Sequence, residues 1–216
     1  MAYATPDPKD DTEAMSKIGY HHGDLHRTIV AAAIEAIGES GLDGWSLREL
    51  ARRTGVSHAA PAHHFGDKVG VLTAIAAEGF TLLADALEAA EPDFLDIGLA
   101  YVSFAVNHPV HFGVMFQPGI YRADDEAVRQ AETRAGNVLR KGARAVTAPP
   151  SGPEHTTLAA WSIAHGFASL WLNGALRMPA GTDPVEAARP VLRRLLEDPR
   201  STQIGDASLS KARAMA

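Results

Sequence analysis

The sequence contains no cysteine, and this absence excludes disulfide bonds, thiolate metal ligands and cysteine nucleophiles together. A chain without cysteine fits a reducing compartment, so we expect a cytoplasmic protein. No window holds 18 uninterrupted apolar residues, and no membrane-spanning helix is expected. The first 16 residues carry four acids and one lysine, whereas a secretory signal needs a basic start and an apolar run.

Positive charge is scarce. The chain has 20 Lys and Arg against 26 Asp and Glu, which gives a net charge of -6 and argues against a protein that coats nucleic acid. Residues 17–68 are an exception, because their six basic and six acidic residues cancel and they hold six of the ten histidines. Any contact with DNA must therefore be local and come from a few well-placed side chains.

The residue patterns of common enzyme classes are missing. The chain has no Gly-x-Ser-x-Gly elbow, no Gly-rich phosphate loop, no His-Glu-x-x-His and no paired-acid motif. Two groups of histidines suggest metal ligands by their number, but neither completes a recognisable ligand spacing. These groups are His21, His22 and His26, and the pair His108 and His111. We predict no enzyme, no cofactor and no metal site.

Strand patterns are absent as well, and helical periodicity runs through the chain. We predict an all-α fold of about nine helices. The clearest helices are expected after the capping residues Asp24, Asp67 and Asp183, and over about 154–177. Residues 1–17 are rich in Pro and Asp and are predicted to be a flexible leader, and residues 199–216 a disordered tail.

The most informative stretch predicts a helix-turn-helix over about 46–65. Ser46 and Glu49 have the spacing of a capping box, which starts a short helix. Gly55 can adopt a left-handed conformation and break that helix. Ser57 is then placed to cap a second short helix, over about 57–64.

About 50 residues around this motif resemble the DNA-binding domain of the TetR family of transcriptional regulators. The resemblance rests on the run Ser46-Leu47-Arg48-Glu49-Leu50-Ala51-Arg52-Arg53-Thr54-Gly55-Val56-Ser57, followed by His64-Phe65, Lys68 and Leu72. The segments over 19–25 and 57–61 resemble one subgroup, which carries a Trp-x-x-x-His-Gly signature in its C-terminal half. That signature is Trp161-Ser162-Ile163-Ala164-His165-Gly166 here.

The resemblance implies a DNA-binding domain over 18–66 and a ligand-binding and dimerisation domain over 67–198. It further implies a homodimer that binds a palindromic double-stranded DNA operator, usually to repress. A small apolar effector in the larger domain would then shift the spacing of the two DNA-binding heads. An alternative remains open, namely a helical interaction module or ligand-binding protein with weak or lost DNA binding.

The predicted DNA contacts follow the helix-turn-helix. Early residues of its second helix would face base edges in the major groove, and flanking residues would contact the phosphates. The base-facing candidates are Ser57, His58, Ala59 and Ala60, and the others are Tyr20, His21, His22, Ser46, Arg48, His63, His64 and Lys68. The sequence departs from the family at Ala62, where a phosphate-binding tyrosine is usual, and this departure supports the alternative.

The helix over about 154–177 is apolar on two faces, so it should pack on two sides. One side would border a ligand pocket and the other the partner subunit, and the sequence leaves open which is which. His165 is placed either to hydrogen-bond a ligand or to be a satisfied core histidine. The ligand candidates are Tyr101, Phe104, Met115, Phe116, Trp161 and His165. The dimerisation candidates are Phe167, Leu170, Trp171, Gly174, Leu192 and Leu195.

Overall fold

The computed structural model describes residues 25–117, 119–147 and 152–196, and within these ranges the chain forms nine helices and no strand. The all-α prediction is confirmed. A first helix spans 25–40. The others are α2 Leu47–Thr54, α3 Ala60–Phe65, α4 Lys68–Ala89, α5 Phe94–Asn107, α6 Pro109–Met115, α7 Glu126–Val146, α8 Pro153–Leu172 and α9 Pro184–Leu196. The predicted leader, the tail and Asp24 lie outside the described residues.

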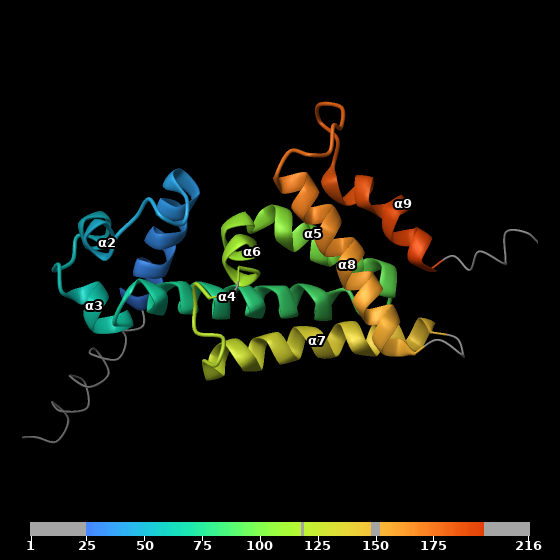
Figure 1. Cartoon of the computed structure of the whole chain (residues 1–216), viewed down its shortest axis with the longest axis horizontal. Coiled ribbons are helices and arrows are strands. Elements are labelled where there is room, and N and C mark those ends of the chain that lie inside the picture. Colours follow the sequence, from blue (N-terminus) through green and yellow to red (C-terminus); the bar gives the residue numbers. More distant parts are fainter. Residues whose placement is uncertain (1–24, 118, 148–151, 197–216) are drawn as a thin grey trace, which may run out of the picture.

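The first three helices form a small unit at one end of α4, and the remaining helices gather around the rest of it (Figure 1). Helix α7 runs beside α4 along most of its length, while α5 and α6 pack on another side of α4. Helices α8 and α9 complete the larger unit by packing on α5. Helix α4 therefore belongs to both units and connects them without a break.

Local chemistry explains where these helices begin and end. The side chain of Ser46 accepts a hydrogen bond from the backbone N–H of Glu49, and Asp67 does the same for Gly70. Asp183 caps α9 in the same way. Gly55 ends α2 in the left-handed region, with φ of 69°. Each capping side chain satisfies one of the backbone N–H groups that the start of a helix leaves without a partner.

Two predicted boundaries need correction. Helix α3 begins at Ala60, without a side-chain cap, because Ser57 closes a backbone turn in which its carbonyl accepts from the N–H of Ala60. Helix α8 ends at Leu172 instead of about residue 177. Gly174, with φ of 66°, turns the chain there, and the N–H of the next residue, Ala175, bonds back to the carbonyl of Leu170.

Helix α4 is long and apolar enough to cross a membrane by length and composition alone. Its apolar side chains are instead used within the protein, because Val71, Ile75 and Leu87 are fully buried in the common core. A core helix packed on several sides has the same composition as a membrane span.

Glycines let the helices approach closely at two points. A Cβ atom at Gly142 of α7 would lie 2.6 Å from Cδ2 of Phe94. A Cβ atom at Gly79 of α4 would lie 2.5 Å from the sulfur of Met115 in α6. Both distances are shorter than real contacts allow, so α5 and α6 sit where they do because these side chains are absent.

The variant Gly142→Ala should lower the free energy of unfolding by about 1–3 kcal/mol, because the added methyl overpacks against Phe94. Gly113→Ala is the matched control, since a Cβ atom at Gly113 of α6 meets open space. That change should be neutral or stabilising by up to about 1 kcal/mol through helix propensity. Urea denaturation at one fixed protein concentration compares the two. Equal effects of both variants would contradict the packing argument.

Candidate functional site

The helix-turn-helix presents a small polar surface over α3 and the turn before it. Ser57, His58 and Ala59 are exposed in that turn, and Ala62 and His63 are exposed in α3. On the inner side of α3, Pro61 and Phe65 are buried, and the ring of Phe65 lies 4.5 Å from that of His26. Burial of one side therefore fixes the direction in which the other side faces solvent.

Most of the predicted DNA contacts fall on or beside this surface. Ser46 and Arg48 are exposed at the start of α2, Ala60 is the first residue of α3, and His64 is half-buried. Lys68 is the first residue of α4, and its Nζ lies 4.7 Å from the ring centroid of Trp45. Tyr20, His21 and His22 lie outside the described residues, so those three stay predictions.

The paired arginines of α2 are occupied by carboxylates. Arg52 and Arg53 both bond to Glu49, and Arg53 also forms a bidentate pair with Glu39 of the first helix. Hydrogen bonds from the two arginines lower the pKa of Glu49 to about 2. The carboxylate of Glu49 therefore bonds to these arginines instead of completing a capping box with Ser46. The pairing ties α2 to the first helix.

The junction between the two units contains an ion pair that the sequence did not indicate. Both side-chain oxygens of Asp67, the residue that caps α4, accept from Nη2 of Arg122 at 2.8–2.9 Å. The backbone N–H of Arg122 also donates to Thr73, whose side chain is buried in α4. The segment that leads into α7 is thereby held at the end of α4 that follows α3.

An apolar pocket of about 320 Å³ lies between α4, α5, α7 and α8. This volume is at the lower end of the range that binds small molecules. Three predicted ligand residues line it, namely Tyr101, Phe116 and Trp161. Residues not predicted complete the lining: Phe80, Leu83, Glu132, Ala135, Gly136, Leu139, Arg140, Arg144, Pro153, Glu154, Thr157 and Leu158.

Three side chains meet in a hydrogen-bonded group at this pocket. The indole N–H of Trp161 donates to the hydroxyl of Tyr101 at 3.2 Å, and that hydroxyl lies 2.9 Å from Nδ1 of His165. Burial raises the pKa of Tyr101 and lowers that of His165. Tyrosine therefore keeps its proton and can donate it to a neutral imidazole. The Trp-x-x-x-His spacing places both partners of Tyr101 one turn apart on α8.

The other two ligand candidates lie in different surroundings. Phe104 stacks on His108 with ring centroids 5.3 Å apart, away from the apolar pocket. Met115 packs against Gly79. Neither residue lines the apolar pocket, so their assignment to the ligand stays a prediction. His111 of α6 is buried, and its Nε2 lies 3.4 Å from the carboxylate of Glu78.

The dimerisation candidates divide into four groups. Leu170 is 48% exposed and Trp171 is half-buried. Phe167 and Leu192 are only 9% and 5% exposed in the single chain, so the structure places them in the chain's own core, where Leu192 packs against Gly98. Gly174 is explained by its left-handed backbone. The side chain of Leu195 lies outside the described residues.

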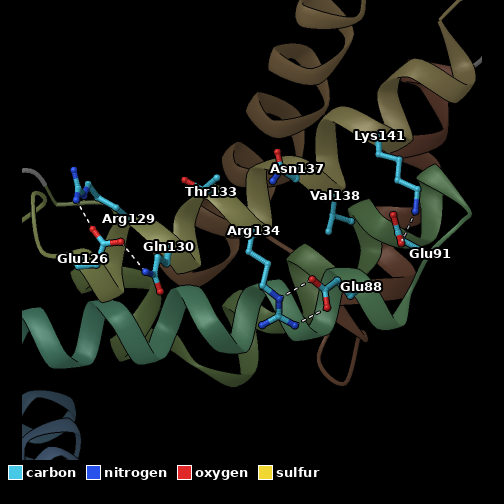
Figure 2. A pocket seen from close by; sticks show the side chains of 10 residues that line it. All are labelled: Glu88, Glu91, Glu126, Arg129, Gln130, Thr133, Arg134, Asn137, Val138 and Lys141. Carbon is cyan, nitrogen blue, oxygen red and sulfur yellow. Dashed lines mark hydrogen bonds and ion pairs between the residues drawn. The ribbon is translucent and has the colours of Figure 1, made fainter.

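A second, larger hollow of about 690 Å³ lies along the outer faces of α4 and α7, and its lining is charged (Figure 2). Arg134 bonds to Glu88, Lys141 to Glu91, and Arg129 to Glu126. Its cations are thus already neutralised by exposed carboxylates. The apolar pocket, with its buried polar group, is the stronger candidate for a ligand site.

His165 should make stability depend on pH. In the unfolded chain a histidine titrates near a pKa of about 6.5, and burial lowers the pKa in the folded protein. The unfolded state therefore binds more protons below that pH, and the free energy of unfolding falls as the pH drops. His165→Gln keeps an acceptor for Tyr101 without titrating, so this variant should lose less stability between about pH 7 and pH 5.5.

Urea denaturation across this pH range measures the difference. His155→Gln changes an exposed histidine of the same helix and should keep the wild-type pH dependence. An unaltered pH dependence in His165→Gln would show that protonation of this imidazole is not linked to folding.

Comparison with known proteins agrees with both units. Residues 29–75 match the model of bacterial regulatory proteins of the tetR family, and residues 94–195 match the tetracyclin repressor-like C-terminal domain. Among curated proteins, the HTH-type transcriptional regulator BetI of Escherichia coli (strain K12 / DH10B) is 38% identical over 61 residues, which are 28% of this chain and 31% of BetI. The match therefore spans about a third of the length of that curated relative.

Solved structures extend the likeness to most of the chain. A protein of unknown function from Rhodococcus sp. RHA1 is 33% identical, with a TM-score of 0.65 over 82% of this chain and 96% of its own. AibR in complex with isovaleryl coenzyme A and operator DNA is 15% identical, with a TM-score of 0.61 over 79% of this chain and 97% of its own. With two family models that together cover more than half of its length, this chain belongs to the TetR family of bacterial transcriptional regulators.

Proposed function

We propose that the protein is a homodimeric repressor that binds a palindromic operator through α3 and is released by a small effector in the apolar pocket. The observation that carries this proposal is the position of α6, which contacts both the pocket and the DNA-binding unit. The AibR complex, which has the same fold and holds both an acyl coenzyme A and operator DNA, supports a protein with two such sites.

Helix α6 can transmit a change from one site to the other. At its C-terminal end, the rings of Phe112 and Phe116 lie 5.0 and 4.7 Å from His165. Near its N-terminal end, Val110 approaches Gly38 of the first helix, where a Cβ atom would lie 3.7 Å from it. A ligand that displaces Phe116 therefore acts on α6, the helix that also supports the DNA-binding unit. Such a ligand contacts the DNA-bound and the released conformations differently, and this difference shifts the equilibrium between them.

Exposed apolar side chains support a dimer through α8 and α9. Leu170 is 48% exposed on α8 and Val191 is 44% exposed on α9, whereas the exposed Leu158 of α8 lines the apolar pocket. Large exposed apolar side chains on adjacent helices are typical of an interface. We assign the face with Leu170 to the partner and the face with Trp161 and His165 to the pocket.

We also assign the chain to the subgroup with the Trp-His-Gly signature. In support, the Trp and His of that signature, Trp161 and His165, share Tyr101 as a hydrogen-bond partner. We assign these groups to binding and not to catalysis, and the protein to the cytoplasm.

A gel-shift titration tests operator binding. The full chain should bind the promoter region next to its own coding sequence more tightly than random DNA of equal length and at equal salt. His58→Ala should weaken promoter binding more than random binding if His58 contacts a base edge, whereas His155→Ala, distant on α8, should change neither. Equal affinity for both DNAs would favour the alternative of an interaction module without specific DNA binding.

Ala62→Tyr should strengthen DNA binding several-fold. Ala62 is exposed on α3, where a phenol would point toward the phosphates in the family's docking geometry. The hydrogen bond to a charged acceptor is worth roughly 1.5–3 kcal/mol before ordering costs, and about 1 kcal/mol should remain.

Because phosphates carry no sequence information, the gain should be similar on promoter and random DNA. Ala62→Phe is the control, because it adds the ring without the hydroxyl and should give no comparable gain. Weaker binding by Ala62→Tyr would mean that Pro61 turns α3 away from the assumed pose.

A further inference from the structure

The apolar pocket has chemically different ends, and this difference defines its ligand. Phe80, Leu83 and Phe116 line one part, together with Tyr101 and Trp161. At the other end are Arg140 and Arg144, opposite the first turns of α8. The lining follows α7 for three turns, from Glu132 to Arg144, which is roughly 18 Å at the rise of an α-helix.

The hydroxyl of Tyr101 at the apolar end does not need a hydrogen bond from a ligand. The hydroxyl of Tyr101 already accepts from Trp161 and lies within hydrogen-bond distance of His165. A polar ligand atom here would have to break a satisfied buried group, which is unfavourable. The part of the ligand that lies against Phe80 and Leu83 is therefore hydrocarbon.

The two arginines differ from the other cations of α7. Arg129, Arg134 and Lys141 each pair with a carboxylate. Arg140 instead donates to the neutral amide oxygen of Asn137 at 2.6 Å, and in the described ranges no carboxylate lies within ion-pair distance of Arg140 or Arg144. Like charges one turn apart repel each other, and an anion between them relieves that repulsion.

The two acids of the lining do not cancel this charge. Glu132 lies two turns before Arg140 on α7, and its nearest effect is on Tyr121, whose pKa is raised first by burial and then by this carboxylate. Glu154 lies in the first turn of α8, where no side chain caps the helix and the N-terminal partial charge stabilises a carboxylate. The two guanidinium groups remain available to a ligand.

We propose that the effector is an apolar molecule with one terminal carboxylate, which Arg140 and Arg144 bind while its hydrocarbon fills the space beside Phe80, Leu83 and Phe116. This assignment rests on the proposed function and specifies the ligand class of the same pocket. The cavity of about 320 Å³ is roughly ten times the volume that a water molecule occupies in the liquid. The ligand is accordingly the size of a medium-chain fatty acid or a small aromatic acid.

Calorimetric titration of the full chain with decanoate and with decan-1-ol tests this class. The two probes share their hydrocarbon and differ in the charge of one end. Decanoate should bind about tenfold more tightly than decan-1-ol, and added salt should reduce the difference. Arg140→Gln combined with Arg144→Gln should abolish this preference and leave decan-1-ol binding unchanged.

Arg129→Gln combined with Lys141→Gln is the matched control, because it removes the same charge from the same helix outside the apolar pocket. This variant should keep the preference for decanoate. Equal binding of the two probes by the unmodified chain would overturn the carboxylate assignment and leave an apolar effector in place. Loss of the preference in the control would overturn it too, because net charge alone would then explain it.

A gel-shift with promoter DNA separates this inference from the proposed function. Decanoate that binds in the calorimeter and releases the DNA supports both. If decanoate binds with the expected preference but the DNA stays bound, the result contradicts release by the effector. The ligand class is then unaffected. Failure of decanoate to bind overturns the ligand class directly.

Discussion

The close packing of α6 on Gly79 of α4 is the constraint on which the two units depend. A Cβ atom at Gly79 would lie 2.5 Å from the sulfur of Met115 and 3.1 Å from Cβ of His111, so α6 packs this closely without a shift only because that position is glycine. This packing places α6 between the pocket and the first helix, so that Phe116 and Val110, at opposite ends of one short helix, contact different units. A longer separation between α4 and α6 would weaken this connection between the pocket and the first helix.

The distribution of charge follows from the scarcity of cations. Arg53 of α2 pairs with Glu39 and joins two helices, and Arg134 on the outer face of α7 neutralises a carboxylate of α4. Cations that are free of such pairing are consequently informative about binding. In the described part of the chain, the cations without a carboxylate partner include Lys68, whose ammonium group lies over Trp45, the exposed Arg48 of α2 and the two arginines of the pocket.

The helix-turn-helix was predictable because its signals are local. Ser46, Gly55 and Asp67 act on backbone groups within a few residues, so their spacing alone specifies the helix ends. The pocket residues were predicted only in part. Periodicity shows which side of a helix is apolar, but it does not show which neighbouring helix Phe104 or Phe116 contacts. The same limit explains Phe167 and Leu192, which are buried by α8, α9 and α5 of the same chain. The pair of Asp67 and Arg122 joins residues 55 positions apart, which no local pattern reveals.

The short side chains of α3 have a consequence for how DNA is selected. Between Ala59 and Ala62 the helix carries only methyl groups and a proline ring, and these offer no hydrogen bonds to base edges. Methyl groups distinguish thymine by contact alone. In the proposed complex, hydrogen bonds to base edges are therefore left to Ser57 and His58, which are exposed in the turn before α3.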